Sequence, residues 1–260
     1  MIWRLYQKAL QATVLAAAIL VSPMASAVEE ATRALAEQLE VVDGLTKLGD
    51  DLKAVITTDL GFTDAQIERW HDAVDAAFAV NLLEADSLEA LESVTTEDTR
   101  QAALAYERSD LAVEVGEQVE TLFLEEGAEA LVEAGQSYLE SASASENALL
   151  VDLFAAQRSP ERADLEMDIY FRAMAIMAAP ITGPEVAEEW VESAQYLRED
   201  YSRDNLLLRI GAYSTVPEAQ LVEVVEKLND PLLVAFSSQL VTALSETMHA
   251  ATDRIETEYD

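Results

Sequence analysis

The chain lacks cysteine and has only two histidines among its 260 residues. Without cysteine, disulfides, thiolate nucleophiles, zinc–thiolate sites and iron–sulfur clusters are excluded. The sequence also has no Gly-x-Ser-x-Gly elbow, phosphate-binding loop, glycine-rich dinucleotide turn or calcium-binding loop. We therefore expect no catalytic, cofactor-binding or metal-binding residue, no cofactor, and a protein that is not an enzyme.

Positive charge, glycine and proline are scarce as well. The 16 Lys+Arg residues stand against 50 Asp+Glu, which gives a formal net charge of −34. A chain this acidic is not expected to bind nucleic acid through a basic face or to dock on an anionic membrane. Eight glycines and six prolines are too few for the many turns of a β-sandwich. The hydrophobic content of 50% is enough to bury a sizeable core.

Residues 1–27 have the three parts of a secretory signal peptide. Arg4 and Lys8 supply the basic part, residues 9–21 the apolar part, and Ala25-Ser26-Ala27 a small-residue cleavage site. The apolar run is short for a membrane span of about 20 residues. We expect cleavage near Ala27 and a soluble chain in the bacterial periplasm, with secretion from the cell as the alternative and no stable membrane insertion afterwards.

Apolar residues recur at helical spacing through most of the remaining chain. One example is the stripe that contains Ile67, Trp70 and Phe78, which follows a capping box at Thr63 and predicts a long helix to about Glu92. Strand patterns are missing. The sequence therefore predicts an all-α helical bundle of about six to nine helices.

A weak internal repeat favours two related halves. The segment around Trp70 aligns with the segment around Trp190 at an offset of about 120 residues. Because the identities are few, shared composition explains the match as well as duplication does. We divide the chain after the signal into a first helical half, residues 28–144, and a second helical half, residues 145–260.

The segment Thr96–Leu111 resembles the signature of the bacterial "domain of unknown function 2059" family. In that family an acidic and apolar helix runs into an aromatic residue and then Arg-Ser-Pro-Leu-Gly. The matching residues here are Tyr106, Arg108, Ser109 and Leu111, while Asp110 and Ala112 stand in place of proline and glycine. The stretch Asn229–Leu232 is similar to the same turn, with its proline retained. The resemblance implies an exported, all-helical, non-catalytic protein and assigns no functional residues.

Two Glu-x-x-His pairs are candidates for a metal centre, because di-iron carboxylate bundles use two such pairs. The pairs and the aspartates four residues after each histidine are Glu68, His71, Asp75, Glu246, His249 and Asp253. His71 falls within the apolar arc of its helix. His249 lies about 100° from its helix's apolar arc. We therefore interpret His71 as a partly buried side chain and His249 as a surface one.

The segment Met167–Ala179 is apolar around most of its circumference, apart from Asp168 and Arg172, which are spaced to pair. Such a helix is normally buried on most faces, so we expect it at the centre of the second half. Its three methionines either fill irregular gaps in a closed core or line a deformable groove.

Two function classes remain open from the sequence. The first is a non-catalytic interaction or structural module that binds a protein or another envelope component. The acidic surface is then either a solvated face or a docking surface for a cationic partner. The second is a periplasmic carrier or chaperone for an apolar ligand held between helices.

The signal peptide gives the first testable prediction. Protein recovered from its native host should begin at Val28 or within a few residues of it, because the small-residue site ends at Ala27. N-terminal sequencing measures this directly. A chain that still begins at Met1 in the membrane fraction would contradict the prediction.

Overall fold

The computed structural model describes residues 25–56, 62–193 and 196–259. Residues 1–24 of the predicted signal peptide lie outside these ranges. All twelve regular elements in the described part are helices, which confirms the all-α class and shows that the expected count of six to nine is too low. The helices are α1 (Ala25–Gln38), α2 (Val41–Val55), α3 (Asp64–Ala77), α4 (Val80–Val94), α5 (Glu97–Glu107), α6 (Asp110–Ser141), α7 (Ala144–Ala156), α8 (Ser159–Thr182), α9 (Pro184–Ser193), α10 (Tyr196–Tyr213), α11 (Glu218–Leu228) and α12 (Pro231–Tyr259). Within the same ranges, no helix combines the length and the apolarity needed to cross a bilayer.

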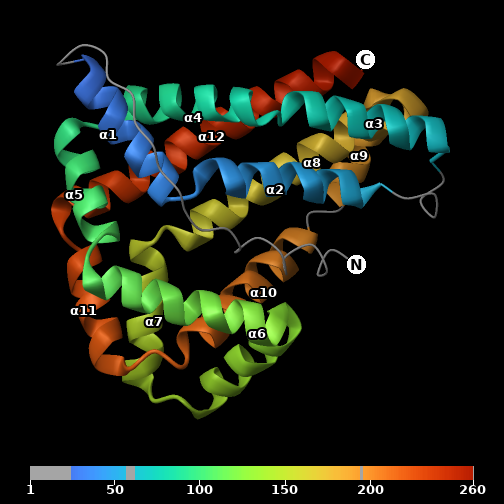
Figure 1. Cartoon of the computed structure of the whole chain (residues 1–260). Helices are drawn as coiled ribbons and strands as arrows, with labels where there is room; N and C mark the ends of the chain where they lie inside the picture. The colour runs from blue at the N-terminus through green and yellow to red at the C-terminus, as the bar shows by residue number, and fades with distance from the viewer. Residues whose placement is uncertain (1–24, 57–61, 194–195, 260) are drawn as a thin grey trace.

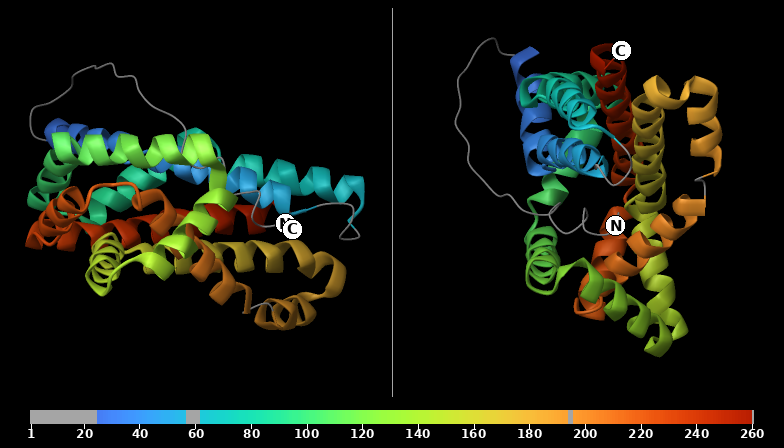
Figure 2. Two further views of the ribbon diagram at one scale, coloured as in Figure 1. Left: turned by 90° about the horizontal axis from the view of Figure 1, so that it is seen from below. Right: turned by 90° about the vertical axis from the view of Figure 1, so that its right-hand side faces the viewer.

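The helices form two lobes (Figures 1 and 2). The first lobe contains α1–α5 together with α12, and the second contains α6, α7, α10 and α11. Helix α8 joins them, since it packs against α12 on one side and against α7 and α10 on the other. Both sequence halves therefore contribute helices to the first lobe and to the second.

Short polar side chains begin several of the helices. Thr63 forms the capping box that the sequence predicts at the start of α3, and Thr96 forms a second reciprocal box at the start of α5. Ser109 caps α6, and Ser143 caps α7. These caps supply acceptors to backbone N–H groups that have no partner in the first helical turn.

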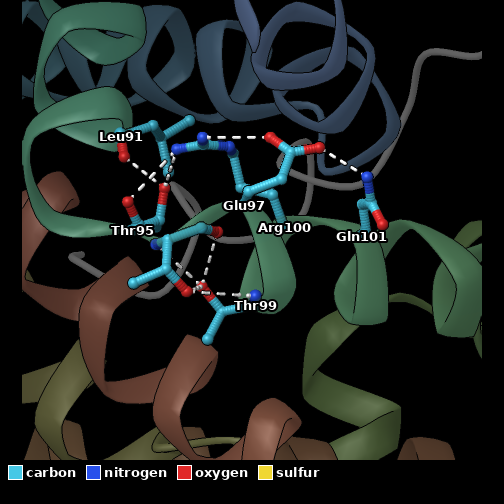
Figure 3. A network of polar contacts seen from close by, with 7 residues as sticks. Leu91, Thr95, Glu97, Thr99, Arg100 and Gln101 are labelled. Carbon is cyan, nitrogen blue, oxygen red and sulfur yellow. Dashed lines mark hydrogen bonds and ion pairs between the residues drawn. The ribbon is translucent and has the colours of Figure 1, made fainter.

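At the corner between α4 and α5, the buried guanidinium of Arg100 binds Thr95, the residue directly before the cap Thr96 (Figure 3). Arg100 is 5% exposed, and its guanidinium donates to the Thr95 carbonyl at 3.2 Å and to the Thr95 hydroxyl at 2.8 Å. The same guanidinium lies 3.3 Å from Glu97. The turn is therefore held by side chains from both sides of the corner.

The long helix expected from Ile67 to about Glu92 is interrupted in the structure. Helix α3 ends at Ala77, and Phe78 and Ala79 leave helical geometry before α4 begins. The ring of Phe78 then packs against Gly49 of α2, where an added Cβ would lie 2.9 Å from the ring. Arg254 of α12 donates to the Ala77 carbonyl at 3.0 and 3.1 Å and so caps the end of α3.

Helix α8 continues through Pro180 to Thr182, and Gly183, with φ of 85°, ends the helix. The two charged residues of the segment Met167–Ala179 differ from the expectation. Asp168 and Arg172 do not pair with each other but with other helices. Arg172 binds Asp253 of α12 at 2.5 Å, and Asp168 binds Arg198 of α10 at 2.5 Å.

Helices α1–α6 and α7–α12 form two successive six-helix series. The last helix of the first series, α6, is broken at Gly127, whose φ of 77° and ψ of 164° are not helical, whereas α12 runs from Pro231 to Tyr259. Glu40 and Arg158 are the two non-glycine residues with positive φ in the described part, and each lies directly before the second helix of its series. Each last helix packs mainly on the other series. Helix α12 packs against α3, α4 and α5 as well as α8, while α6 packs against α10 and α11.

Helices α6 and α10 cross at a pair of glycines. A Cβ on Gly135 would lie 1.9 Å from the Leu207 carbonyl oxygen, and a Cβ on Gly211 would lie 1.9 Å from the Leu131 carbonyl oxygen. Real side chains do not reach such distances from a backbone atom. The contact therefore requires glycine on both helices, and it allows weak Cα–H···O contacts across the crossing.

This crossing generates a stability prediction. Gly211→Ala and Gly135→Ala should each lower the free energy of unfolding by about 1–3 kcal/mol or more, because the helices must separate to fit a methyl group. Gly116→Ala, also on α6, is the matched control, since a Cβ there meets nothing within 4 Å. It should raise stability by about 0.5–1 kcal/mol. Urea unfolding measures all three, and equal effects of the three substitutions would contradict the crossing.

Candidate functional site

Four of the candidate metal ligands bind other groups of the protein. The Nε2 atom of His71 lies 3.2 Å from the Lys53 carbonyl, and the Nδ1 atom of His249 lies 2.6 Å from the Ser245 carbonyl. Asp75 binds Lys53 at 2.6 Å, and Asp253 binds Arg172. Glu68 and Glu246 are exposed. Within residues 25–56, 62–193 and 196–259, no cluster of three or more His, Cys, Asp or Glu has the arrangement of a metal site.

The methionines of α8 do not form a groove. Met167 and Met177 are 4% and 1% exposed, and Met174 is half-buried against the cluster of Met167 and Phe171. Trp70 is also buried, and its indole N–H donates to the Leu52 carbonyl at 3.0 Å. The side chain of Trp190 lies outside what the structure describes. These observations favour a gap-filling role for the α8 methionines.

A cavity of about 170 Å³ lies where the two lobes meet. It is bounded by α5, α8, α10, α11 and α12, and by the turns that follow α1 and α7. Its apolar wall consists of Leu39, Ala103, Leu228, Leu233, Phe236 and Leu240. An apolar cavity of about 150 Å³ binds benzene in an engineered protein, so this space is large enough for a small organic molecule.

The opposite wall of the cavity is polar. It carries Glu107 at the end of α5, Gln157 after α7, Arg162 on α8 and Arg209 on α10. Glu107 is the last residue of α5, and Gln157 is the C-cap that follows α7, so both side chains lie at helix ends. All four are half-buried. The cavity therefore combines a hydrocarbon surface with charged groups.

Two buried polar atoms of this wall have no hydrogen-bond partner among the described residues, the Nε atom of Arg162 and the Oε1 atom of Gln157. The amide nitrogen of Gln157 donates to the Tyr213 hydroxyl at 3.0 Å, and the Nε atom of Arg209 donates to Asn205 at 2.9 Å. An unsatisfied buried polar atom costs about 1–3 kcal/mol. Six further buried side-chain atoms in the described part of the chain, none of them on residues that line the cavity, also have no partner.

Burial and nearby charges change the pKa of Arg162. Burial and the neighbouring charge of Arg209 lower the pKa of Arg162 to about 10, although Glu166 and Glu107 partly offset this. The Arg162 guanidinium nevertheless remains charged at neutral pH. Burial also raises the pKa of Glu107, against the opposing effect of Arg162. Two cations and one carboxylate therefore line the cavity.

Four of the lining residues lie at similar places in the two series. Leu39 and Gln157 each directly precede a positive-φ residue, and Glu107 and Leu228 end α5 and α11.

Sequence reasoning missed this site. Glu107 and Arg162 are separated by the whole of α6 and α7, and Arg209 lies farther along the chain, so spacing gives no signal that they meet. The sequence offers one feature that sets the two arginines apart, since they are among only 16 basic residues in a strongly acidic chain.

No family model, curated protein or solved structure matches the chain.

A polar seam continues from the cavity between α2 and α8. Glu166, one turn after Arg162, accepts a hydrogen bond from the Tyr201 hydroxyl, and its charge acts on Asp51 of α2. Burial raises the pKa of Asp51 to about 6, with Asp50 and Glu166 adding to the effect and Lys47 opposing it. Asp51 therefore takes up a proton in the folded protein more readily than in the unfolded chain.

The seam gives a prediction about pH. Because the folded pKa of Asp51 is raised, the wild type gains stability as the pH falls through about 6. Asp51→Asn should be more stable than the wild type at pH 8, on the order of 1 kcal/mol for this partly exposed group. The difference should vanish near pH 4. Urea unfolding across this range tests it, with Asp72→Asn at an exposed position as the matched control. A pH-independent difference would contradict it.

Proposed function

We propose that this chain is a non-catalytic binding protein of the bacterial periplasm that holds a small molecule between its helices. The observation that carries the proposal is the cavity at the junction of the lobes, where the Nε atom of Arg162 and the Oε1 atom of Gln157 are buried without partners. A bound molecule would satisfy these atoms and cover the apolar wall.

The other expectation, an interaction module that acts only through its surface, has less support from the structure. A purely structural core would place leucine at both copies of the corresponding positions, yet Gln157 and Glu107 occupy one copy of each. Docking of a cationic partner on the acidic surface remains compatible with ligand binding. The export step rests on the predicted signal peptide.

We also infer that the chain consists of two related six-helix units with exchanged last helices. The support is the repeated helix order, the matched positive-φ residues Glu40 and Arg158, and the matched corners at Ser109 and Asp230. Ser109 and Asp230 each bind a backbone N–H at the start of a long helix. These two corners also carry the resemblance to the "domain of unknown function 2059" family, whose kinship with this chain we propose on that basis.

The binding proposal is tested by thermal unfolding with panels of small organic acids, amines, alcohols and amides. At least one class should raise the melting temperature. A ligand at 100 times its Kd adds about 2.7 kcal/mol, or about 5–10 °C for a protein of this size. Ser237→Leu, which places extra carbon atoms in the cavity, should abolish the shift.

Ser238→Leu is the matched control, since Ser238 is the exposed neighbour of Ser237 on α12. It should leave the ligand-induced shift unchanged. A wild type that responds to no class, or a Ser237→Leu variant that keeps the full response, would refute a ligand in this cavity.

A further inference from the structure

The chemistry of the cavity restricts what it can hold. Arg162 and Arg209 both line the cavity, and the charge of Arg209 disfavours the charged form of Arg162, while Glu166 and Glu107 favour it. Among the described residues, the Nε atom of Arg162 is buried without a partner, and Glu107 is the one acidic side chain that lines the cavity. An anion between the two guanidinium groups would reduce their repulsion and accept the unused hydrogen bond.

We propose that the ligand is a small monocarboxylate with a compact apolar body, whose carboxylate is bound by Arg162 and Arg209. This rests on the proposed function. The apolar body lies against the wall formed by Leu228, Leu233, Phe236 and Leu240. Arginine suits this role because its planar donors match the two oxygens of a carboxylate.

The volume of the cavity and the net charge of the protein favour some anions over others. The volume of about 170 Å³ admits a body about as large as a benzene ring or a short aliphatic chain, and excludes long fatty acids. The chain carries a net charge of −34, so the field of the whole molecule opposes entry of an anion and opposes a dianion more strongly. Inorganic phosphate, in addition, has no apolar part to bury. A monocarboxylate is therefore favoured over phosphate.

Calorimetric titration of the exported protein tests the proposal with three probes. These are benzoate, its neutral analogue benzamide, and inorganic phosphate. Benzoate should bind at least 10-fold more tightly than benzamide or phosphate, because a hydrogen bond to a charged group is worth about a factor of ten or more. This comparison uses the wild type alone and does not depend on any variant folding.

Variants then locate the carboxylate. Arg162→Gln and Arg209→Gln should each weaken benzoate binding at least 10-fold and leave benzamide binding within about twofold, since an amide makes no ion pair. Arg203→Gln is the matched control on α10, because Arg203 is exposed and pairs with Asp200 and Asp204. It should change the Kd of benzoate by less than about twofold.

The outcomes separate this inference from the proposed function. Equal binding of benzamide and benzoate, blocked by Ser237→Leu, would overturn the carboxylate and leave a ligand cavity. Phosphate binding as tight as that of benzoate would overturn the apolar body. Benzoate binding that is unchanged in both arginine variants would place the anion elsewhere. If no probe binds the wild type and no class in the thermal panel raises its melting temperature, both proposals fail.

Discussion

The crossing of α6 and α10 at Gly135 and Gly211 is the contact on which the rest of the arrangement depends. Through this contact α6, the last helix of the first sequence half, lies in the second lobe, where its backbone touches the backbone of α10. The last helix of the second half, α12, completes the first lobe against α3, α4 and α5. Each lobe is thereby closed by a helix from the other half. The two halves are interlocked, and neither lobe has a complete core without the other half of the chain.

The interlocking explains where the cavity lies. Its walls come from α5 and α11, which directly precede the exchanged helices, and from α12 itself. Side chains from both series must fit together here. Leu39 and Leu228 are apolar, whereas Gln157 and Glu107 are polar.

Local features of the fold could be read from the sequence, and features that need two distant segments could not. The capping box at Thr63 is contained in a few consecutive residues, so the sequence alone predicts it. The break at Phe78 is not predicted in this way, because its cause is the space at Gly49 and the guanidinium of Arg254, which lie on other helices. The ion pairs of α8 show the same limit. Asp168 and Arg172 have the spacing to pair with each other, yet both find partners across helix interfaces.

The sequence by itself determined the helical class, because apolar spacing and a scarcity of turn residues act within short windows of the chain. It also determined that cysteine chemistry is absent, because composition is independent of folding. Only the tertiary structure decided the packing of α12 on α3–α5, the packing of α6 on α10, and the meeting of Arg162 with Arg209. All three depend on which helix faces pack together over long sequence distances. That choice is set by close fits such as Gly135 against Leu207, and the helical pattern of either segment alone does not contain it.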